Sequence, residues 1–125
     1  MLNTDVMKIS SEKTFTVGEL WEAVFCSDGA GMVYWAPKIR KPNGKSIDIW
    51  KGEDFEPNPQ DFKVWDSYES KWHEVSLENL RYGYELAVKE GQTHCGGYKL
   101  DIDDSDACFG DLVIQYAIFE KLIYG

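Results

Sequence analysis

Four aspartates within six residues form the densest group of metal-ligand side chains in the sequence. They are Asp101, Asp103, Asp104 and Asp106. Asp101, Asp103 and Ser105 match the first three ligand positions of an EF-hand calcium loop. The match then fails, because Asp106 stands where that loop needs glycine and Leu112 where it needs a bidentate glutamate. We therefore favour an acidic turn that begins a helix, where negative charge meets the positive helix end.

The histidines and cysteines form no recognisable metal or nucleophile motif. His94 is followed directly by Cys95, but no further ligands follow at a zinc-binding spacing. A Cys–His nucleophile pair stays formally open, with nothing in the spacing to favour it. The sequence has three cysteines and no CxxC pair, so we expect reduced thiols rather than a disulfide framework. We predict no catalytic residue, no metal and no cofactor.

Basic residues gather in one part of the chain. Between Ala36 and Gly52 they are opposed by Asp48 alone, and they are Lys38, Arg40, Lys41, Lys45 and Lys51. Lysines of this kind commonly protect an exposed edge strand from aggregation. The alternative is a ligand site in which Lys38, Arg40 and Lys41 meet phosphates. Tyr34 or Trp35 would then stack on a base.

The rest of the chain is acidic, and the whole carries a net charge of −9 with a pI near 4.6. Besides the four aspartates, an acidic loop follows the basic segment and contains Glu53, Asp54 and Glu56. Such a charge disfavours direct binding to nucleic acid or to an anionic membrane. It favours a basic protein partner, because complementary charge speeds encounter.

Sequence signals predict three helices. Thr16 and Glu19 form a capping box before a helix over residues 17–25. Ser76 is the expected N-cap of a second helix, which Gly91 ends.

The third helix begins near Asp106 and is apolar over most of its circumference, which is typical of a buried helix at the centre of a core. Its apolar spacing continues through Leu122 and Ile123, and only a narrow polar strip through Asp111 and Gln115 interrupts it. Gly110 in this helix suggests a close approach of another backbone.

Strands are expected where aromatic and β-branched residues alternate between turns. The expected ranges are 32–39, 46–50, 62–66, 71–75 and a short strand through Tyr98, Leu100 and Ile102. Helices and strands are segregated, which predicts an α+β fold: one domain over residues 1–125, with a mostly antiparallel sheet of about four or five strands packed by about three helices. Residues 1–13 are expected to be a loose arm, and no segment is long and apolar enough to cross a bilayer.

Three of these segments together carry a family resemblance. They are the glycine-preceded Tyr-Trp stretch at 31–35, the Trp-centred strand and Leu-rich helix start at 72–80, and the acidic turn with its closing IQYAIFEKLIYG helix at 101–125. In these the chain resembles a group of small uncharacterised proteins carried by phages and conjugative elements of gut bacteria. The resemblance implies an accessory protein of a mobile element, a class often active against host defence, and carries over no catalytic residue.

Two binding functions and one catalytic function are left open by the sequence. The first is a counter-defence inhibitor in the cytoplasm of the bacterial host, whose acidic residues bind a defence protein with a basic nucleic-acid-binding surface. The second is a protein that sequesters a small nucleotide-like signal through the basic segment, for which a homo-oligomer with pockets between subunits is the natural architecture. An enzyme is the third, although no residues single it out.

Overall fold

The protein was analysed as a computed structural model, which describes residues 6–8, 14–25, 31–48, 59–94, 98–99 and 107–124. The helices in these ranges are α1 (Val17–Phe25), η1 (Gly31–Tyr34, a 3-10 helix), α2 (Leu77–Lys89) and α3 (Ala107–Phe119). The strands are β1 (Val6–Lys8), β2 (Thr14–Thr16), β3 (Lys38–Arg40), β4 (Ser46–Asp48), β5 (Phe62–Asp66), β6 (Lys71–Val75), β7 (Thr93–His94) and β8 (Tyr98–Lys99). The α+β class predicted from the sequence is confirmed.

The largest sheet of the described residues has four antiparallel strands in the order β4-β3-β5-β6. Its strands alternate between two faces, as a pleated sheet requires. The inner face carries the aligned residues Ile47, Ile39, Val64 and His73. The first three of these are buried. The opposite, outer face carries polar and aromatic side chains.

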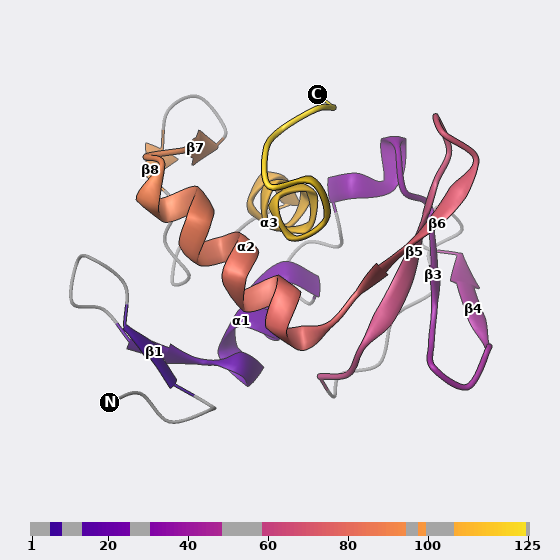
Figure 1. Cartoon of the computed structure of the whole chain (residues 1–125), viewed down its shortest axis with the longest axis horizontal. Coiled ribbons are helices and arrows are strands. Elements are labelled where there is room, and N and C mark those ends of the chain that lie inside the picture. The colour runs from indigo at the N-terminus through magenta and orange to yellow at the C-terminus, as the bar shows by residue number, and fades with distance from the viewer. Residues whose placement is uncertain are drawn as a thin grey trace.

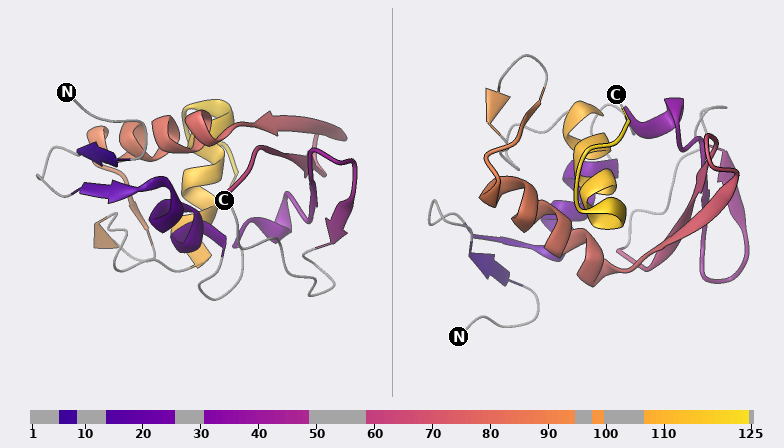
Figure 2. Two further views of the ribbon diagram at one scale, coloured as in Figure 1. Left: turned by 90° about the horizontal axis from the view of Figure 1, so that it is seen from below. Right: turned by 45° about the horizontal axis from the view of Figure 1, so that its top comes forward.

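Helix α3 lies between the sheet and α2, and Figure 1 views α3 almost along its axis. The two further views in Figure 2 show α2 crossing α3. Helix α1 also packs against α3, and its Trp21 and Phe25 rings contact Phe62 of β5. Val113 and Ile114 of α3 are fully buried, and Leu112 and Tyr116 are nearly so. The central position predicted for this helix follows from its apolar circumference.

Two glycines let the helices approach closely. A Cβ atom added to Gly110 would lie 2.7 Å from the backbone oxygen of Val24, which confirms the close approach expected there. At Gly83 of α2 the Cβ would lie 2.5 Å from the backbone nitrogen of Ala117. The contact at Gly83 was not foreseen, because nothing in the sequence pairs α2 with α3 in register.

The caps of the first two helices are those that the sequence predicts. The amide of Glu19 donates to Thr16 Oγ1 (3.1 Å), and the amide of Thr16 donates to Glu19 Oε1 (2.8 Å). Ser76 Oγ accepts from the amide of Asn79 (3.0 Å) at the start of α2. Gly91, with φ of +73°, adopts the left-handed conformation that follows the end of α2.

Three local predictions were wrong. Residues 32–37 do not form a strand: Gly31–Tyr34 is the 3-10 helix η1, and only Lys38–Arg40 is a strand. The N-terminal arm is structured in part, because Val6–Lys8 pairs with Thr14–Thr16. Helix α3 ends at Phe119, where Glu120 turns the backbone with a φ of +61°.

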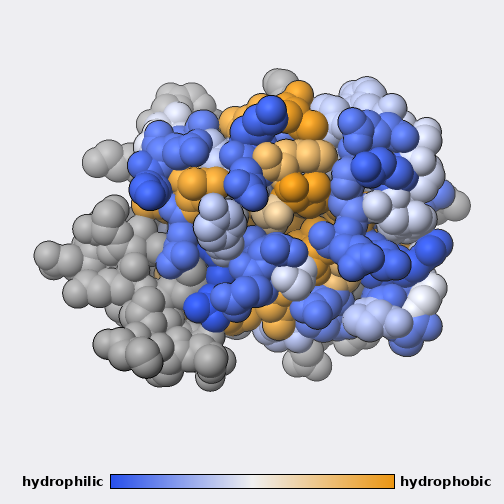
Figure 3. All heavy atoms as spheres, in the orientation of Figure 1, coloured by the Kyte–Doolittle hydropathy of each residue, from blue (hydrophilic) through white to orange (hydrophobic). Residues whose placement is uncertain are grey.

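Leu122 and Ile123 therefore follow α3 as an extended tail, and they are 42% and 40% exposed rather than buried. Figure 3 shows hydrophobic atoms at the surface where the C-terminal end of the chain lies in Figure 1. Parts of two predicted strands, residues 49–50 and 100–102, lie outside the described residues. Among the helices that are described, none combines the length and apolarity needed to cross a membrane.

The cysteine prediction also needs correction. Cys108 is disulfide-bonded, so the expectation of a reduced thiol is wrong for this residue. Its position in the first turn of α3 is exposed. Cys26 and Cys95 lie outside the described residues.

Candidate functional site

The outer face of the four-stranded sheet gathers cationic and aromatic side chains. Register places Lys38 beside Trp65 and Trp65 beside Trp72, and in the next row it places Arg40 beside Lys63. Residues opposite one another on neighbouring strands point to the same side of a sheet. We call these five residues the basic–aromatic face. Lys38 and Lys63 are exposed, and the other three are partly exposed.

Arg40 is held in position on this face. Its guanidinium carbon lies 4.2 Å from the centre of the Trp72 ring, and its Nε donates to Ser46 Oγ (3.2 Å). The Trp72 ring in turn meets Trp65 in an edge contact with centroids 5.3 Å apart. A guanidinium placed over an aromatic ring keeps its charge while losing side-chain freedom. Arg40 is therefore ordered before any ligand binds.

A pocket of about 330 Å³ lies at the end of this face nearest to α2. Arg40, Lys41 and Lys63 line it together with the carboxylates of Asp61 and Glu74. Other lining residues come from the turn after β3, from strands β5 and β6 and from the start of α2: Pro42, Gly44, Phe62, Val75, Ser76 and Asn79. Asp61 Oδ1 accepts from the amide of Leu77 (3.0 Å). The cations outnumber the carboxylates in the lining, which favours an anionic group.

The five residues of the predicted ligand site lie in two places, the basic–aromatic face with its pocket and a position beside α3. Arg40 and Lys41 line the pocket, and Lys38 lies on the basic–aromatic face. Trp35 is fully buried and donates from Nε1 to Asp111 Oδ1 (2.7 Å). The ring of Trp35 therefore offers no exposed face to a base. In the part of the chain that the structure describes, Trp65 and Trp72 are the tryptophans beside the basic residues.

Tyr34 is 41% exposed, but like Trp35 it lies beside α3 rather than on the basic–aromatic face. Its hydroxyl donates to Asp111 Oδ2 (2.6 Å). Burial, followed by this hydrogen bond, raises the pKa of Tyr34 well above its ordinary value of 10.0. The hydroxyl is therefore tied to α3 rather than to the basic strand.

The acidic residues predicted to meet a protein partner lie outside the described residues. These are Asp101, Asp103, Asp104, Asp106, Glu53, Asp54 and Glu56.

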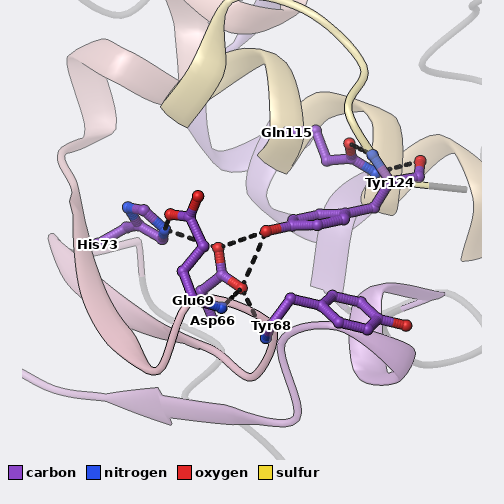
Figure 4. A network of polar contacts seen from close by, with 6 residues as sticks. All are labelled: Asp66, Tyr68, Glu69, His73, Gln115 and Tyr124. Carbon is purple, nitrogen blue, oxygen red and sulfur yellow. Dashed lines mark hydrogen bonds and ion pairs between the residues drawn. The ribbon is translucent and has the colours of Figure 1, made fainter.

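A second polar centre lies on the inner side of the sheet, around Asp66 (Figure 4). Asp66 is fully buried. Its Oδ1 accepts from the amides of Tyr68 (3.0 Å) and Glu69 (3.1 Å), and its Oδ2 lies 3.0 Å from His73 Nε2. The hydroxyl of Tyr124 lies 3.0 Å from Oδ1 and 2.8 Å from Oδ2. A buried carboxylate with this many partners is fully satisfied.

Gln115 brings the C-terminal tail to this centre. It is fully buried, and its Oε1 accepts from the amides of Ile123 and Tyr124, each at 2.9 Å. Its Nε2 lies 3.2 Å from the Tyr124 carbonyl oxygen, 3.0 Å from Asp111 Oδ1 and 3.3 Å from the Tyr34 hydroxyl. Gln115 thus fixes the tail in a course that carries the Tyr124 ring to Asp66 (Figure 4). The sequence placed Gln115 on a polar strip, whereas the structure shows it as a buried residue that joins α3 to the tail by hydrogen bonds.

The pKa values of Tyr124 and Asp66 are shifted in opposite directions. Burial, and then the hydrogen bond to Asp66, raise the pKa of Tyr124 from 10.0 to about 12. Burial alone would raise the pKa of Asp66, but hydrogen bonds from His73, Tyr124 and two amides outweigh it and hold that pKa below its ordinary 3.8. The folded state therefore favours a neutral tyrosine and an ionised aspartate.

These shifts predict a pH dependence of stability. Tyr124 stabilises the fold fully below pH 10 and loses that contribution as the pH rises through about 12, because the unfolded state releases its proton first. For Asp66 the sign is opposite: its contribution is present above 3.8 and is lost as the pH falls through the lower folded value. Tyr124→Phe should give a shallower decline of the free energy of unfolding above pH 10, measured by urea unfolding. Tyr82→Phe, at an exposed tyrosine of α2, is the control and should keep the wild-type slope.

The sequence contained a weak signal for the Asp66 centre. A buried-strand pattern ending in aspartate, followed by a turn and a histidine on the returning strand, places the two side chains near each other when the hairpin is formed. The partner Tyr124 carries no sequence signal, because it reaches Asp66 only through the tertiary fold.

Comparison with known proteins gave no match to a family model, to a curated protein or to a solved structure.

Proposed function

We propose that the protein binds a small phosphate-bearing ligand with an aromatic base on the basic–aromatic face. The observation that carries the proposal is the alignment of Lys38 and Arg40 with Lys63, Trp65 and Trp72 on one sheet face. Cations bind phosphate oxygens with charge-assisted hydrogen bonds, and aromatic rings stack on bases of any sequence. A nucleotide needs both groups within one ligand length.

The pocket supports an orientation for this ligand. Arg40 and Lys63 belong to the face and also line the pocket, so a phosphate bound there stays beside the two tryptophans. Because the Arg40 guanidinium is already held by Trp72 and Ser46, binding costs less side-chain entropy. Asp61 and Glu74 repel a second phosphate on their side of the pocket. A compact nucleotide fits this charge pattern better than a long polyanion.

A second candidate function rests on charge. The chain carries −9 overall, and much of its acidic excess lies in the segments that contain Glu53–Glu56 and Asp101–Asp106. We propose, as this alternative, that these residues bind a basic host defence protein. Both functions suit an accessory protein of a mobile element that sequesters a signal or blocks a defence enzyme. Neither needs a catalytic residue.

One experiment separates the two functions. The full chain is titrated calorimetrically with nucleoside monophosphates, nucleoside diphosphates and cyclic dinucleotides, and we expect one of these to bind. Its affinity should fall about tenfold or more in Arg40→Gln and in Lys63→Gln, because hydrogen bonds to charged groups contribute about 1.5–3 kcal/mol. Trp72→Leu should weaken the same ligand. The matched control Lys89→Gln, at an exposed lysine of α2, should bind as wild type.

The acidic variant completes the test. Replacing Asp103, Asp104 and Asp106 together by lysine should leave nucleotide binding intact. If no nucleotide binds the wild type, and affinity capture from a host lysate recovers a basic protein that this triple variant loses and Arg40→Gln keeps, the acidic surface is the functional one. Sedimentation of the purified chain decides whether the ligand site is completed by a second copy.

The compartment that we propose is the cytoplasm of a bacterial host. The disulfide at Cys108 would have to persist there against reducing thiols, which is uncommon. Alkylation of thiols in freshly lysed cells, followed by mass spectrometry of the peptide that contains Cys108, tests this part of the proposal.

A further inference from the structure

Asp66, Glu69 and His73 each direct one potential ligand atom to a common point. These atoms, one from each side chain, all lie within 4.8 Å of one another. His73 Nε2 is 3.0 Å from Asp66 Oδ2 and 3.9 Å from Glu69 Oε1. Ligands about 2.0–2.2 Å from a tetrahedral zinc ion lie roughly 3.3–3.6 Å apart. These two distances bracket that separation, and the third side of the triangle, from Asp66 to Glu69, is at most 4.8 Å, so Glu69 must move toward the other two side chains to complete the site.

The hairpin itself builds this group. Asp66 is the last residue of β5 and His73 lies in β6, and the turn between them returns the chain so that Glu69 reaches back over both (Figure 4). Ser70, with φ of +55°, makes the reversal at the end of the turn. The three residues thus come from one local segment, the β5–β6 hairpin.

Surrounding groups orient the ligands as they do in known metal sites. Asp66 Oδ1 accepts two backbone amides. The Tyr124 hydroxyl lies 3.0 Å from Oδ1 and 2.8 Å from Oδ2, and Oδ2 also faces His73. The His73 ring meets Phe119 edge-on, with centroids 5.1 Å apart. Metal-binding carboxylates and imidazoles are commonly fixed by hydrogen bonds and packing of this kind.

Exposure differs along the group in a way that suits an open site. The side chain of Asp66 is 0% exposed, that of His73 10% and that of Glu69 50%. A metal held by these three would face solvent on the Glu69 side. A site with three protein ligands leaves a further position for water or an anion.

We propose that Asp66, Glu69 and His73 form a binding site for one divalent transition-metal ion, with zinc as the best-suited ion. One imidazole nitrogen with two carboxylate oxygens favours such an ion over calcium or magnesium, which prefer oxygen ligands alone. Binding replaces the His73–Asp66 hydrogen bond with two metal bonds, and the imidazole proton resides on Nδ1. The two carboxylates neutralise the charge of the ion.

This site is separate from the proposed nucleotide face. Asp66 and His73 lie on the inner side of the sheet, whereas the basic–aromatic face is on the outer side. Failure of either proposal therefore leaves the other standing.

Titration of zinc sulfate into the chelator-treated, thiol-alkylated full chain tests the proposal, because alkylation removes cysteine as a ligand. We expect one zinc ion per chain. Glu69→Gln should weaken zinc binding by at least about tenfold, and His73→Gln should weaken it further. His94→Gln replaces the other histidine of the sequence and should bind as wild type.

Cobalt absorption provides an independent reading of the ligand set, since its visible bands report coordination and should vanish in His73→Gln. Glu69 is half exposed, so Glu69→Gln is expected to fold normally, and circular dichroism verifies this for every variant. Absence of saturable zinc binding at millimolar concentration overturns the proposal. So does binding that Glu69→Gln and His73→Gln leave unchanged, or that His94→Gln abolishes.

Discussion

Replacing Gly83 with alanine is expected to destabilise the protein by about 3 kcal/mol or more, at the upper end of what overpacking costs. The added Cβ would lie 2.5 Å from the nitrogen and 2.7 Å from the Cα of Ala117, and 2.9 Å from the carbonyl carbon of Tyr116. These are backbone atoms of α3, so no rotation of a side chain relieves the overlap. The higher helix propensity of alanine returns only about 1 kcal/mol. The helices must therefore separate, which loosens the centre of the core.

Urea unfolding measures this loss, and Gly18→Ala is its matched control. Gly18 is also helical, but a Cβ there meets nothing closer than Thr16 Oγ1 at 3.8 Å, an ordinary contact. Gly18→Ala should be neutral or slightly stabilising. Equal stability of the two variants would contradict the close crossing of α2 and α3.

Replacing Gln115 with leucine should cost about 3 kcal/mol and release the C-terminal tail. Leucine fills a similar space but accepts no hydrogen bond, so the amides of Ile123 and Tyr124 lose the acceptor that they share. Each buried polar group left without a partner costs about 1–3 kcal/mol. The tail can reach water instead, but Tyr124 then leaves Asp66 and the Trp35 ring, whose centroid lies 5.0 Å from its own. Either route loses the same contacts.

Hydrogen exchange at the amides of Ile123 and Tyr124, together with thermal unfolding, measures both parts of this effect. The control is Gln92→Leu, which removes a single hydrogen bond to the Tyr116 hydroxyl (2.8 Å). Exchange should accelerate in Gln115→Leu alone. If the two variants lose equal stability and keep protected tail amides, Gln115 does not hold the tail.

Local signals were enough to predict α1 and α2, because their caps are interactions between residues three positions apart. They failed at residues 32–37, where aromatic and β-branched residues favoured a strand. The structure forms a 3-10 turn there, and Tyr34 and Trp35 both donate to Asp111. The acceptor of these hydrogen bonds belongs to α3, more than seventy positions further along the chain. The intrinsic propensities of residues 32–37 therefore could not predict this turn.

The candidate site shows the same division. Composition identified the basic segment, and Arg40 and Lys41 do line a pocket. The tryptophans next to the basic residues were not foreseen, since register rather than proximity in sequence places Trp65 beside Lys38. Gln115 was placed on a narrow polar strip of the third helix, and its role in holding the tail was not foreseen. Its burial is stabilised by backbone groups of the tail, whose path depends on where α3 ends.

The contact between Tyr124 and Asp66 spans 58 positions of the chain and therefore has a consequence for biosynthesis. The β5–β6 hairpin is made early and can form as soon as its residues emerge. Until residues 115–124 have also been translated, the Asp66 carboxylate and the neighbouring face of Trp35 lack their tyrosine cover. A nascent chain halted before that point would present a partly open core to chaperones and to other nascent chains. Synthesis of residues 115–124, rather than formation of the sheet, would then be the step that closes the native core.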